Sequence, residues 1–555
     1  MSDKTFEMIF KAPLSPGEGR YVGSIPPLNS RTVRADGMII DYDVAVRMRD
    51  GVRIYVDIYR PDREGKYPAL VCWTPYGKFR SNYDFITEPN VRLHEFNVSK
   101  YATFEGLDPI YWCRNDYVII NADSRGAWNS EGDLTYYSEE EAQDCYDLIE
   151  WASTQYWSSG KVAMGGVSYL AWTQWKVAAI SPPHLVAINP WEGVSDFYRE
   201  WTFHGGIPIN RLARTTSGYS RTRIEDVLEM RKRHPLFDDY WASKNPDLSK
   251  IVVPAFVVAS WSDQCMHTRG TLEGFKRITS KDKWLIVHGR KKWWYFYQEE
   301  NVEKQRQFFD MFLKGIDNHV KDWPKVTLEI REKFYVGNTR TENEWPLART
   351  QYTKLFLNAR EGTLNESPIE KETQVGYSVD NMWDKTQNAK FEFKFDKRTE
   401  LTGHMKLKLW AEAYGSDDMD LFVAIQKTDR AGYLVGFPFD QKHDDGPVTL
   451  GWLRASHREL DEKRSTPYQP YHKHEREIKL KVSEIFPMEI EIIPSSTLFE
   501  RGEKLRLVVQ GSDIYYPPGM SGCSHTELVN KGKHVIHAGG EYDSHLLVPV
   551  IPCGD

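Results

Sequence analysis

The chain has 555 residues, more than a single hydrophobic core usually supports, so two or three domains are expected. Its net charge of -7 at pH 7, with acidic and basic residues interspersed, provides no basic face for nucleic acid. Charges at the N-terminus and throughout the chain leave no room for a signal peptide or a membrane span, which predicts a cytoplasmic protein with no membrane partner.

Residues 43–315 alternate strand-like and helix-like segments, as an α/β sheet requires. An Asp-Gly turn at Asp50-Gly51 lies between apolar runs at 44–48 and 52–59 and predicts a hairpin. The nearly continuous apolar run at 67–73 is typical of a strand buried on both faces. Further strands are predicted at 117–121, 185–190, 252–260 and 284–287, and helices at 139–154, 172–180 and 301–316.

Residues 162–171 form an apolar run that enters a Gly-x-Ser-x-x-Ala turn and then a helix-compatible segment. This is the pattern of a nucleophile elbow, in which a serine stands at the tip of a strand with its hydroxyl exposed. Small residues at Gly166 and Ala171 let strand and helix approach closely. The pattern predicts that Ser168 is a catalytic nucleophile.

A serine needs a histidine to take its proton and a carboxylate to orient that histidine. In the α/β-hydrolase arrangement these follow in the order Ser, Asp, His, each just beyond a strand. Asp263 follows the apolar run at 252–259 and is the candidate acid. His288 directly follows the run at 284–287 and is the candidate base, with His267 in reserve.

The oxyanion of an acyl-transfer intermediate needs two preorganised donors. The elbow should turn the backbone N–H of Tyr169 toward the site. The hydroxyl of Tyr76, in a loop that leaves a buried strand, is the candidate second donor.

Residues 195–247 are polar, aromatic and helix-prone, which predicts a helical lid over the active-site edge. Its aromatic side chains indicate either a bulky apolar substrate group or packing within the lid; they are Phe197, Tyr198, Trp201 and Phe203. From about residue 352 onward short alternating runs predict an all-β sandwich, with strands at 405–411, 421–425, 478–482 and 505–509.

No metal and no cofactor are predicted. The six cysteines have no C-x-x-C spacing, and we expect free buried thiols at Cys72, Cys113, Cys145, Cys265, Cys523 and Cys553. Two histidine pairs lack supporting ligands and are expected on the solvated surface; they are His472 with His474 and His534 with His537.

Four segments occur in a characteristic order: 74–78 (Thr-Pro-Tyr-Gly-Lys), 123–126 (Asp-Ser-Arg-Gly), 166–169 (Gly-Val-Ser-Tyr) and 261–263 (Trp-x-Asp). With the C-terminal motifs at 401–403, 420–423, 451–458 and 499–507, this pattern resembles the cocaine-esterase and X-Pro dipeptidyl-peptidase superfamily (CocE/NonD-type serine hydrolases) over residues 42–550. The resemblance implies an α/β-hydrolase domain with a helical cap insertion, followed by a jelly-roll-like sandwich. It also implies Ser168 as nucleophile, Asp263 as acid, and Tyr76 with Tyr169 as the oxyanion hole.

One departure from the family pattern concerns the base. The family usually ends its eighth strand with Gly-Pro-Trp-x-His, but here the sequence is His288-Gly289-Arg290-Lys291-Lys292-Trp293, and the usual histidine position is Trp293. The base is therefore assigned to His288, just upstream. The basic run at 290–292 indicates either an anionic substrate or, more simply, a solvated turn.

These observations predict a serine hydrolase that cleaves a carboxylic ester, or an amide, of a small, largely apolar molecule. An acyltransferase or amide acylase using the same site is one alternative, and a silent ligand-binding protein that has lost its base is another. The oligomeric state stays open, a homodimer being one option. The predicted domains are an extension at 1–40, the hydrolase domain at 41–194 and 251–345, the cap at 195–250 and the sandwich at 346–555.

Overall fold

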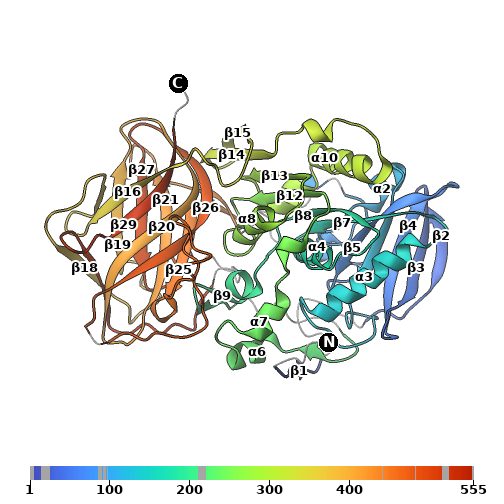
Figure 1. Cartoon of the computed structure of the whole chain (residues 1–555), viewed down its shortest axis with the longest axis horizontal. Helices are drawn as coiled ribbons and strands as arrows, with labels where there is room; N and C mark the ends of the chain where they lie inside the picture. Colours follow the sequence, from blue (N-terminus) through green and yellow to red (C-terminus); the bar gives the residue numbers. More distant parts are fainter. Residues whose placement is uncertain are drawn as a thin grey trace.

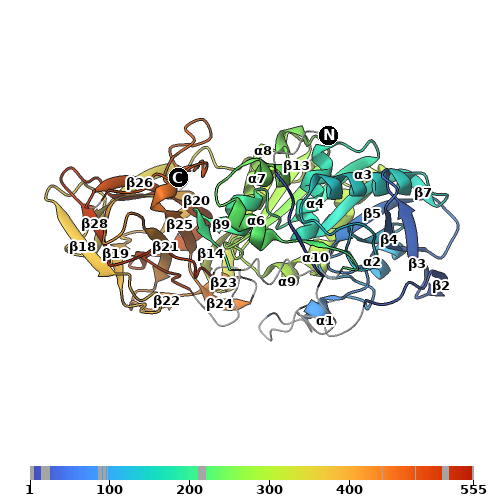
Figure 2. The same ribbon diagram turned by 90° about the horizontal axis from the view of Figure 1, so that it is seen from below.

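The computed structural model describes residues 6–13, 25–85, 91, 95–96, 98–210, 220–440, 442–481, 483–515 and 524–552. Figure 1 shows two parts side by side: an α/β part at right, from the N-terminal half of the chain, and a β-rich part at left, from the C-terminal half. The view from below in Figure 2 shows the same two parts, with β9 at their junction.

The α/β part is built on one sheet whose interior strands are parallel. Hydrogen-bonded neighbours give the order β2-β3-β4-β6-β5-β7-β8-β12-β13-β14-β15, parallel from β6 to β14 and antiparallel at both edges. The predicted hairpin is confirmed as β3 paired with β4. The strands are β2 (Arg31–Ala35), β3 (Met38–Arg47), β4 (Arg53–Pro61), β5 (Tyr67–Thr74), β6 (Val118–Asp123), β7 (Ser158–Val167), β8 (Leu185–Trp191), β12 (Ala255–Ser260), β13 (Lys283–His288), β14 (Val326–Lys333) and β15 (Val336–Glu342).

Helices cover both faces of this sheet, which explains why β5 is buried along its whole length. Leu70 and Cys72 pack into one apolar cluster and Val71 and Trp73 into another, as the alternation of a strand requires. The helices are α1 (Asn82–Phe85), α2 (Pro109–Arg114), α3 (Glu139–Ser153), α4 (Tyr169–Ala179), α8 (Thr268–Arg277), α9 (Lys292–Phe296) and α10 (Glu299–Phe309), the last followed by a π-helical turn, η5 (Asp310–Lys314).

The segment between β8 and β12, residues 192–254, is here called the insertion segment. Its elements are short: η3 (Phe197–Thr202), β9 (Phe203–His204), β10 (Ile207–Pro208), β11 (Ile224–Glu225), α6 (Val227–Arg233), α7 (Asp239–Lys244) and η4 (Leu248–Lys250). It bonds to the β-rich part, since the Arg454 N–H donates to the Gly205 carbonyl (2.8 Å) and Arg199 Nη2 donates to the His472 carbonyl (2.9 Å). The insertion segment therefore ties the two parts together.

The β-rich part consists of strands around a separate apolar core. The long strand β20 pairs with β26 on one side and with β28 and β29 on the other, while β21 pairs with β25 and β27, and β27 also with β19. Its strands are β16 (Gln351–Asn358), β17 (Thr363–Asn365), β18 (Thr373–Ser378), β19 (Asn388–Lys394), β20 (Thr399–Tyr414), β21 (Asp420–Thr428), β22 (Leu434–Val435), β23 (Phe437–Phe439), β24 (His443–Gly446), β25 (Thr449–Arg454), β26 (Phe486–Phe499), β27 (Lys504–Gln510), β28 (Lys533–Ala538) and β29 (His545–Ile551).

One predicted strand of this part is wrong. Residues 478–481 are irregular, because their backbone makes isolated hydrogen bonds to the Ser456 and Asp417 carbonyls instead of pairing with a strand. The alternation of apolar and basic residues there reflects a half-buried loop. Residue 482 lies outside the described residues.

The cysteines and histidines also differ from expectation. Cys72, Cys113 and Cys145 are free and buried as predicted, but Cys265 is disulfide-bonded, and Cys523 and Cys553 lie outside the described residues. The two histidine pairs are buried, not solvated, because they lie between packed elements; they are His472, His474, His534 and His537. Among the described helices, none combines the length and apolar character needed to cross a membrane.

Candidate active site

Ser168 stands at the sharp turn between β7 and α4. Its backbone has φ 61° and ψ -113°, a positive φ that non-glycine residues rarely adopt, and its side chain does not cap the helix that follows. The turn is closed tightly, since a Cβ on Gly166 would come within 2.7 Å of Leu170. This is the strained strand-to-helix turn that a nucleophile elbow requires.

The histidine at Ser168 is His267. Its Nε2 lies 3.2 Å from Ser168 Oγ, and its Nδ1 is bonded to Asp263 Oδ2. Asp263 lies just past the end of β12, and its carbonyl accepts the His267 N–H (3.0 Å), which fixes the turn that precedes α8. The three side chains are buried and form an unbroken relay from hydroxyl to carboxylate.

His288 does not lie at Ser168, so the assignment of the base to His288 is corrected. Its Nε2 is 3.1 Å from Glu192 Oε1, its Nδ1 accepts the Arg290 N–H, and its ring stacks on Tyr295 at 3.9 Å. Burial lowers the pKa of His288 to about 3, which suits a neutral packing residue. The sequence signal for His267 is its spacing from Asp263, because residues i and i+4 meet across one helical turn.

The charge on Asp263 is set by its neighbours. Burial alone raises its pKa, but the positive charge of Lys292 and the contact with His267 outweigh burial and hold the pKa well below the ordinary value. Lys292 Nζ lies 2.9 Å from Asp263 Oδ2 and 3.1 Å from His267 Nδ1. Sequence analysis missed this role, having treated Lys292 as part of a solvated turn.

The rest of the basic run is also ion-paired. Arg290 pairs with Glu329 (2.9 Å) and Lys291 with Asp444. The expectation of a solvated turn is therefore wrong, because each of the three cations meets a carboxylate from a different element.

The two predicted oxyanion donors lie next to one another. The Tyr76 ring is 5.8 Å from the Tyr169 ring, and Tyr169 is the first residue of α4, where backbone N–H groups lack intrahelical acceptors. The Tyr169 hydroxyl donates to both oxygens of Glu141 at 2.8 Å. The Tyr169 hydroxyl is therefore occupied, which leaves the backbone N–H as the atom of Tyr169 suited to an oxyanion.

Trp293, which the resemblance described above places at the expected histidine position, lies in an aromatic wall. Its Nε1 donates to Glu105 Oε1 (2.8 Å), and its ring is 5.8 Å from Phe104, which in turn packs against Tyr76 at 5.2 Å. The Glu105 carbonyl accepts the N–H of Val167, directly before Ser168. An indole therefore fills the usual histidine position and contacts the elbow through Glu105.

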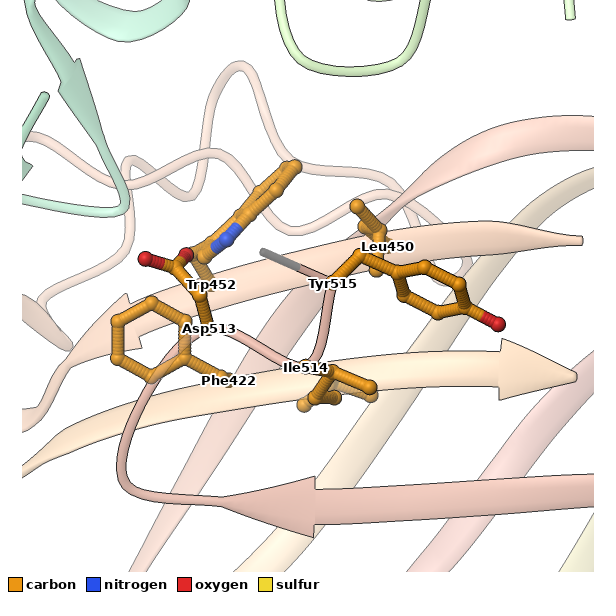
Figure 3. A pocket seen from close by; sticks show the side chains of 7 residues that line it. Phe422, Leu450, Trp452, Asp513, Ile514 and Tyr515 are labelled. Carbon is orange, nitrogen blue, oxygen red and sulfur yellow. The ribbon is translucent and has the colours of Figure 1, made fainter. Parts of the chain in front are cut away.

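Two of the cavities outside this relay lie in or against the β-rich part. One lies between the insertion segment and the β-rich part, and Arg269, two residues after His267 in the chain, forms part of its wall. Its lining includes Arg199, His204, Arg269, Trp452, His472, His474 and Glu491. The other lies in the β-rich part, where the side chains labelled in Figure 3 surround a small space beside Asp513. Both oxygens of Asp513 accept hydrogen bonds from His525 at 2.7 Å, so this carboxylate is already satisfied.

Among the described residues no three His, Cys, Asp or Glu side chains converge as metal ligands would. The relay at Ser168 joins a hydroxyl, an imidazole and a carboxylate, the groups used for acyl transfer.

Comparison with known proteins places this site in a family. Residues 50–223 match the X-Pro dipeptidyl-peptidase (S15 family), and residues 318–547 match the X-Pro dipeptidyl-peptidase C-terminal non-catalytic domain. A CocE/NonD family hydrolase from Staphylococcus aureus is 43% identical, with a TM-score of 0.89 over 97% of this chain and 99% of its own. The chain belongs to the CocE/NonD family.

More distant relatives of this CocE/NonD family protein are also similar over nearly the whole chain. Cocaine esterase from Rhodococcus sp. (strain MB1 Bresler) is 25% identical over 92% of this chain and 98% of its own. An alpha-amino acid ester hydrolase is 16% identical with a TM-score of 0.70, a likeness of fold alone. These relatives are esterases and peptidases, and the fold is a hydrolase fold with an N-terminal catalytic domain and a C-terminal, mostly β domain.

Proposed function

We propose that this protein is a serine esterase that forms an acyl-enzyme on Ser168, with His267 as general base and Asp263 as the acid that orients it. The observation that carries the proposal is the contact of His267 Nε2 with Ser168 Oγ at 3.2 Å, continued through Nδ1 to Asp263. The strained turn at Ser168 and the names of the relatives support it.

The reaction follows from these contacts. Ser168 Oγ attacks the ester carbonyl as its proton moves to His267 Nε2, and Asp263 holds the other ring proton on Nδ1. The carbonyl oxygen, now negative, accepts hydrogen bonds from the Tyr169 N–H and the Tyr76 hydroxyl. His267 then gives its proton to the leaving alcohol, and water, deprotonated by His267, hydrolyses the acyl-enzyme and restores Ser168.

The surroundings favour a small, largely apolar substrate. Tyr76, Phe104 and Trp293 provide an aromatic wall beside the elbow, whereas Tyr198 and Phe203 stack on one another at 4.4 Å and act as packing. In this proposal the insertion segment serves as a helical cap and the β-rich part is a jelly-roll-like sandwich, and the division of the chain into extension, hydrolase domain, cap and sandwich remains part of the proposal.

The structure disfavours one of the two alternative functions and leaves the other open. The silent binding protein was suggested by a missing base, and the His267 contact weighs against it. Acyl transfer or amide cleavage would use the same groups, and product analysis with and without an added amine separates these reactions from ester hydrolysis.

Intact-mass labelling by a fluorophosphonate tests the proposal, followed by turnover of p-nitrophenyl esters. Labelling is expected to vanish in Ser168→Ala and to slow at least about a hundredfold in His267→Ala, because each removes a member of the relay. His288→Gln is the matched control and should label within about threefold of wild type. A folded wild type that fails to label would refute the proposal, and slow labelling in the His288 variant alone would return the base to that residue.

A further inference from the structure

Lys292 reaches the Asp263–His267 pair from another loop. Asp263 and His267 both lie between β12 and α8, whereas Lys292 begins α9, after β13. Its side chain is 2% exposed, and its Nζ lies 2.9 Å from Asp263 Oδ2 and 3.1 Å from His267 Nδ1. A buried ammonium group therefore touches both partners of the proton relay.

The acceptor is shared. Asp263 Oδ2 takes hydrogen bonds from both Lys292 and His267, while Asp263 Oδ1 has no partner within the described part of the chain. One oxygen thus receives two donors from two loops. The lysine fixes where this oxygen lies and, through it, where the imidazole ring is held.

The tautomer of His267 follows from these charges. For His267 Nε2 to accept the proton of Ser168, the ring hydrogen must sit on Nδ1, where an ionised carboxylate stabilises it. An ammonium group at 3.1 Å favours ionised Asp263 but repels a second positive charge on the ring. The ionised carboxylate favours the tautomer with its hydrogen on Nδ1 and its lone pair on Nε2, and the ammonium group opposes protonation of that lone pair.

Other charges near the ring do not cancel this effect. Burial raises the pKa of Glu192 well above its ordinary value, and the charge on Asp263 adds to the rise, so both favour the neutral form of Glu192. Arg269 is paired with Glu200 (2.8 Å) and Glu491 (3.1 Å). His288, Arg290 and Lys291 on the β13–α9 side are neutral or paired elsewhere.

We propose that Lys292 is a positioning residue of this site, which holds Asp263 ionised in place and keeps the ring of His267 neutral and ready to accept the proton of Ser168. This inference rests on the proposed function. It also accounts for the displaced base, because the lysine supports a histidine that shares its loop with the acid.

The test is the pH dependence of kcat/KM for p-nitrophenyl acetate, with fluorophosphonate labelling rates as a second readout. In Lys292→Met the acidic limb of the kcat/KM profile should move to higher pH by about one unit or more. The reason is that loss of a like charge lets the His267 ring protonate at higher pH. The plateau rate should fall about tenfold as Asp263 loses its support. Lys292→Arg, which keeps the charge, should leave the limb within about 0.3 unit of wild type.

Lys291→Met is the matched control, because it removes the neighbouring cation that pairs with Asp444, and its limb should not move. If Lys292→Met does not fold, Lys292→Gln keeps a hydrogen bond without a charge and should show the same displacement. An unmoved acidic limb in a folded neutral variant overturns the proposal. Absence of Ser168-dependent labelling in wild type would instead refute the proposed function.

Discussion

Tyr76 and Tyr169 adjoin each other at the elbow, but they would serve an oxyanion through different atoms. Tyr76 offers its hydroxyl, whereas Tyr169 offers its backbone N–H while its own hydroxyl is held by Glu141. The same substitution, Tyr to Phe, therefore separates a catalytic from a structural hydroxyl.

Tyr76→Phe is expected to lower kcat for an ester by about a hundredfold with little change in KM, as expected for a donor used mainly in the transition state. Tyr169→Phe should leave kcat within about threefold and lower the free energy of unfolding by about 1 kcal/mol, because only a buried hydrogen bond is lost. Steady-state kinetics and denaturant unfolding of the two variants check this. Equal kinetic effects in both would remove Tyr76 from the oxyanion hole.

The candidate site shows what the sequence could and could not predict at the level of single residues. Ser168 and Asp263 follow long apolar runs, so their positions at strand ends were predictable from hydrophobicity alone. The choice between His267 and His288 was harder, because the position of His288 at a strand end competes with the four-residue spacing of His267 from Asp263. It depends on the direction of two side chains, which the turn after Asp263 and the stacking of His288 on Tyr295 determine.

At the level of elements, the site depends on how closely α4, α8 and the end of β8 approach one another. Gly193 follows β8, and a Cβ there would lie 2.9 Å from Ala171 Cβ on α4. Thr271 Oγ1 on α8 accepts the Gly193 N–H (3.0 Å) and contacts the His267 carbonyl at 2.8 Å. One glycine thus links the helix that starts at the nucleophile with the helix that starts at the base.

Gly193→Val is expected to push α4 outward, to lower kcat/KM by about tenfold or more, and to cost about 1–3 kcal/mol of stability from overpacking. Gly376→Ala in β18 is the control, because a Cβ there meets its nearest neighbours at 3.5 Å, and its stability should change by less than about 0.5 kcal/mol. Thermal unfolding and ester turnover measure both. Unchanged activity in Gly193→Val would show that the site tolerates movement of α4.

Most elements of the α/β part were predictable, because parallel strands buried on both faces need continuous apolar runs. The strand predicted at 478–482 failed for the opposite reason, since alternation alone does not say whether a partner strand is available. Likewise, the helix-prone composition of the insertion segment does not specify its division into short helices separated by small strands.

At the level of the whole molecule, the insertion segment and the β-rich part meet through buried histidines. His457 Nδ1 lies 3.0 Å from His474 Nδ1, and His472 Nε2 donates to the Glu489 carbonyl at 2.9 Å, while Arg199 donates to the His472 carbonyl. Burial lowers the pKa of His457 and of His472 to about 4, and that of His474 well below its ordinary value. The junction is therefore assembled from neutral imidazoles.

This arrangement predicts that the protein is destabilised by acid. A histidine whose pKa is about 4 in the folded protein and about 6.5 in the unfolded chain imposes no proton-linked cost on the free energy of unfolding above pH 6.5. The free energy of unfolding falls as the pH drops from 6.5 toward 4. At pH 5 the unfolded chain binds the proton and the folded chain does not, which for His472 alone costs about 2 kcal/mol relative to pH 7.5. The free energy of unfolding is measured with denaturant at pH 7.5 and at pH 5. Its fall between these two pH values should be about 2 kcal/mol smaller in His472→Gln than in wild type. His319→Gln is the control, because it removes a histidine whose side chain is 82% exposed, and its free energy of unfolding should fall as much as that of wild type. If the free energy of unfolding falls equally in wild type and in His472→Gln, protonation of His472 does not govern stability at the junction.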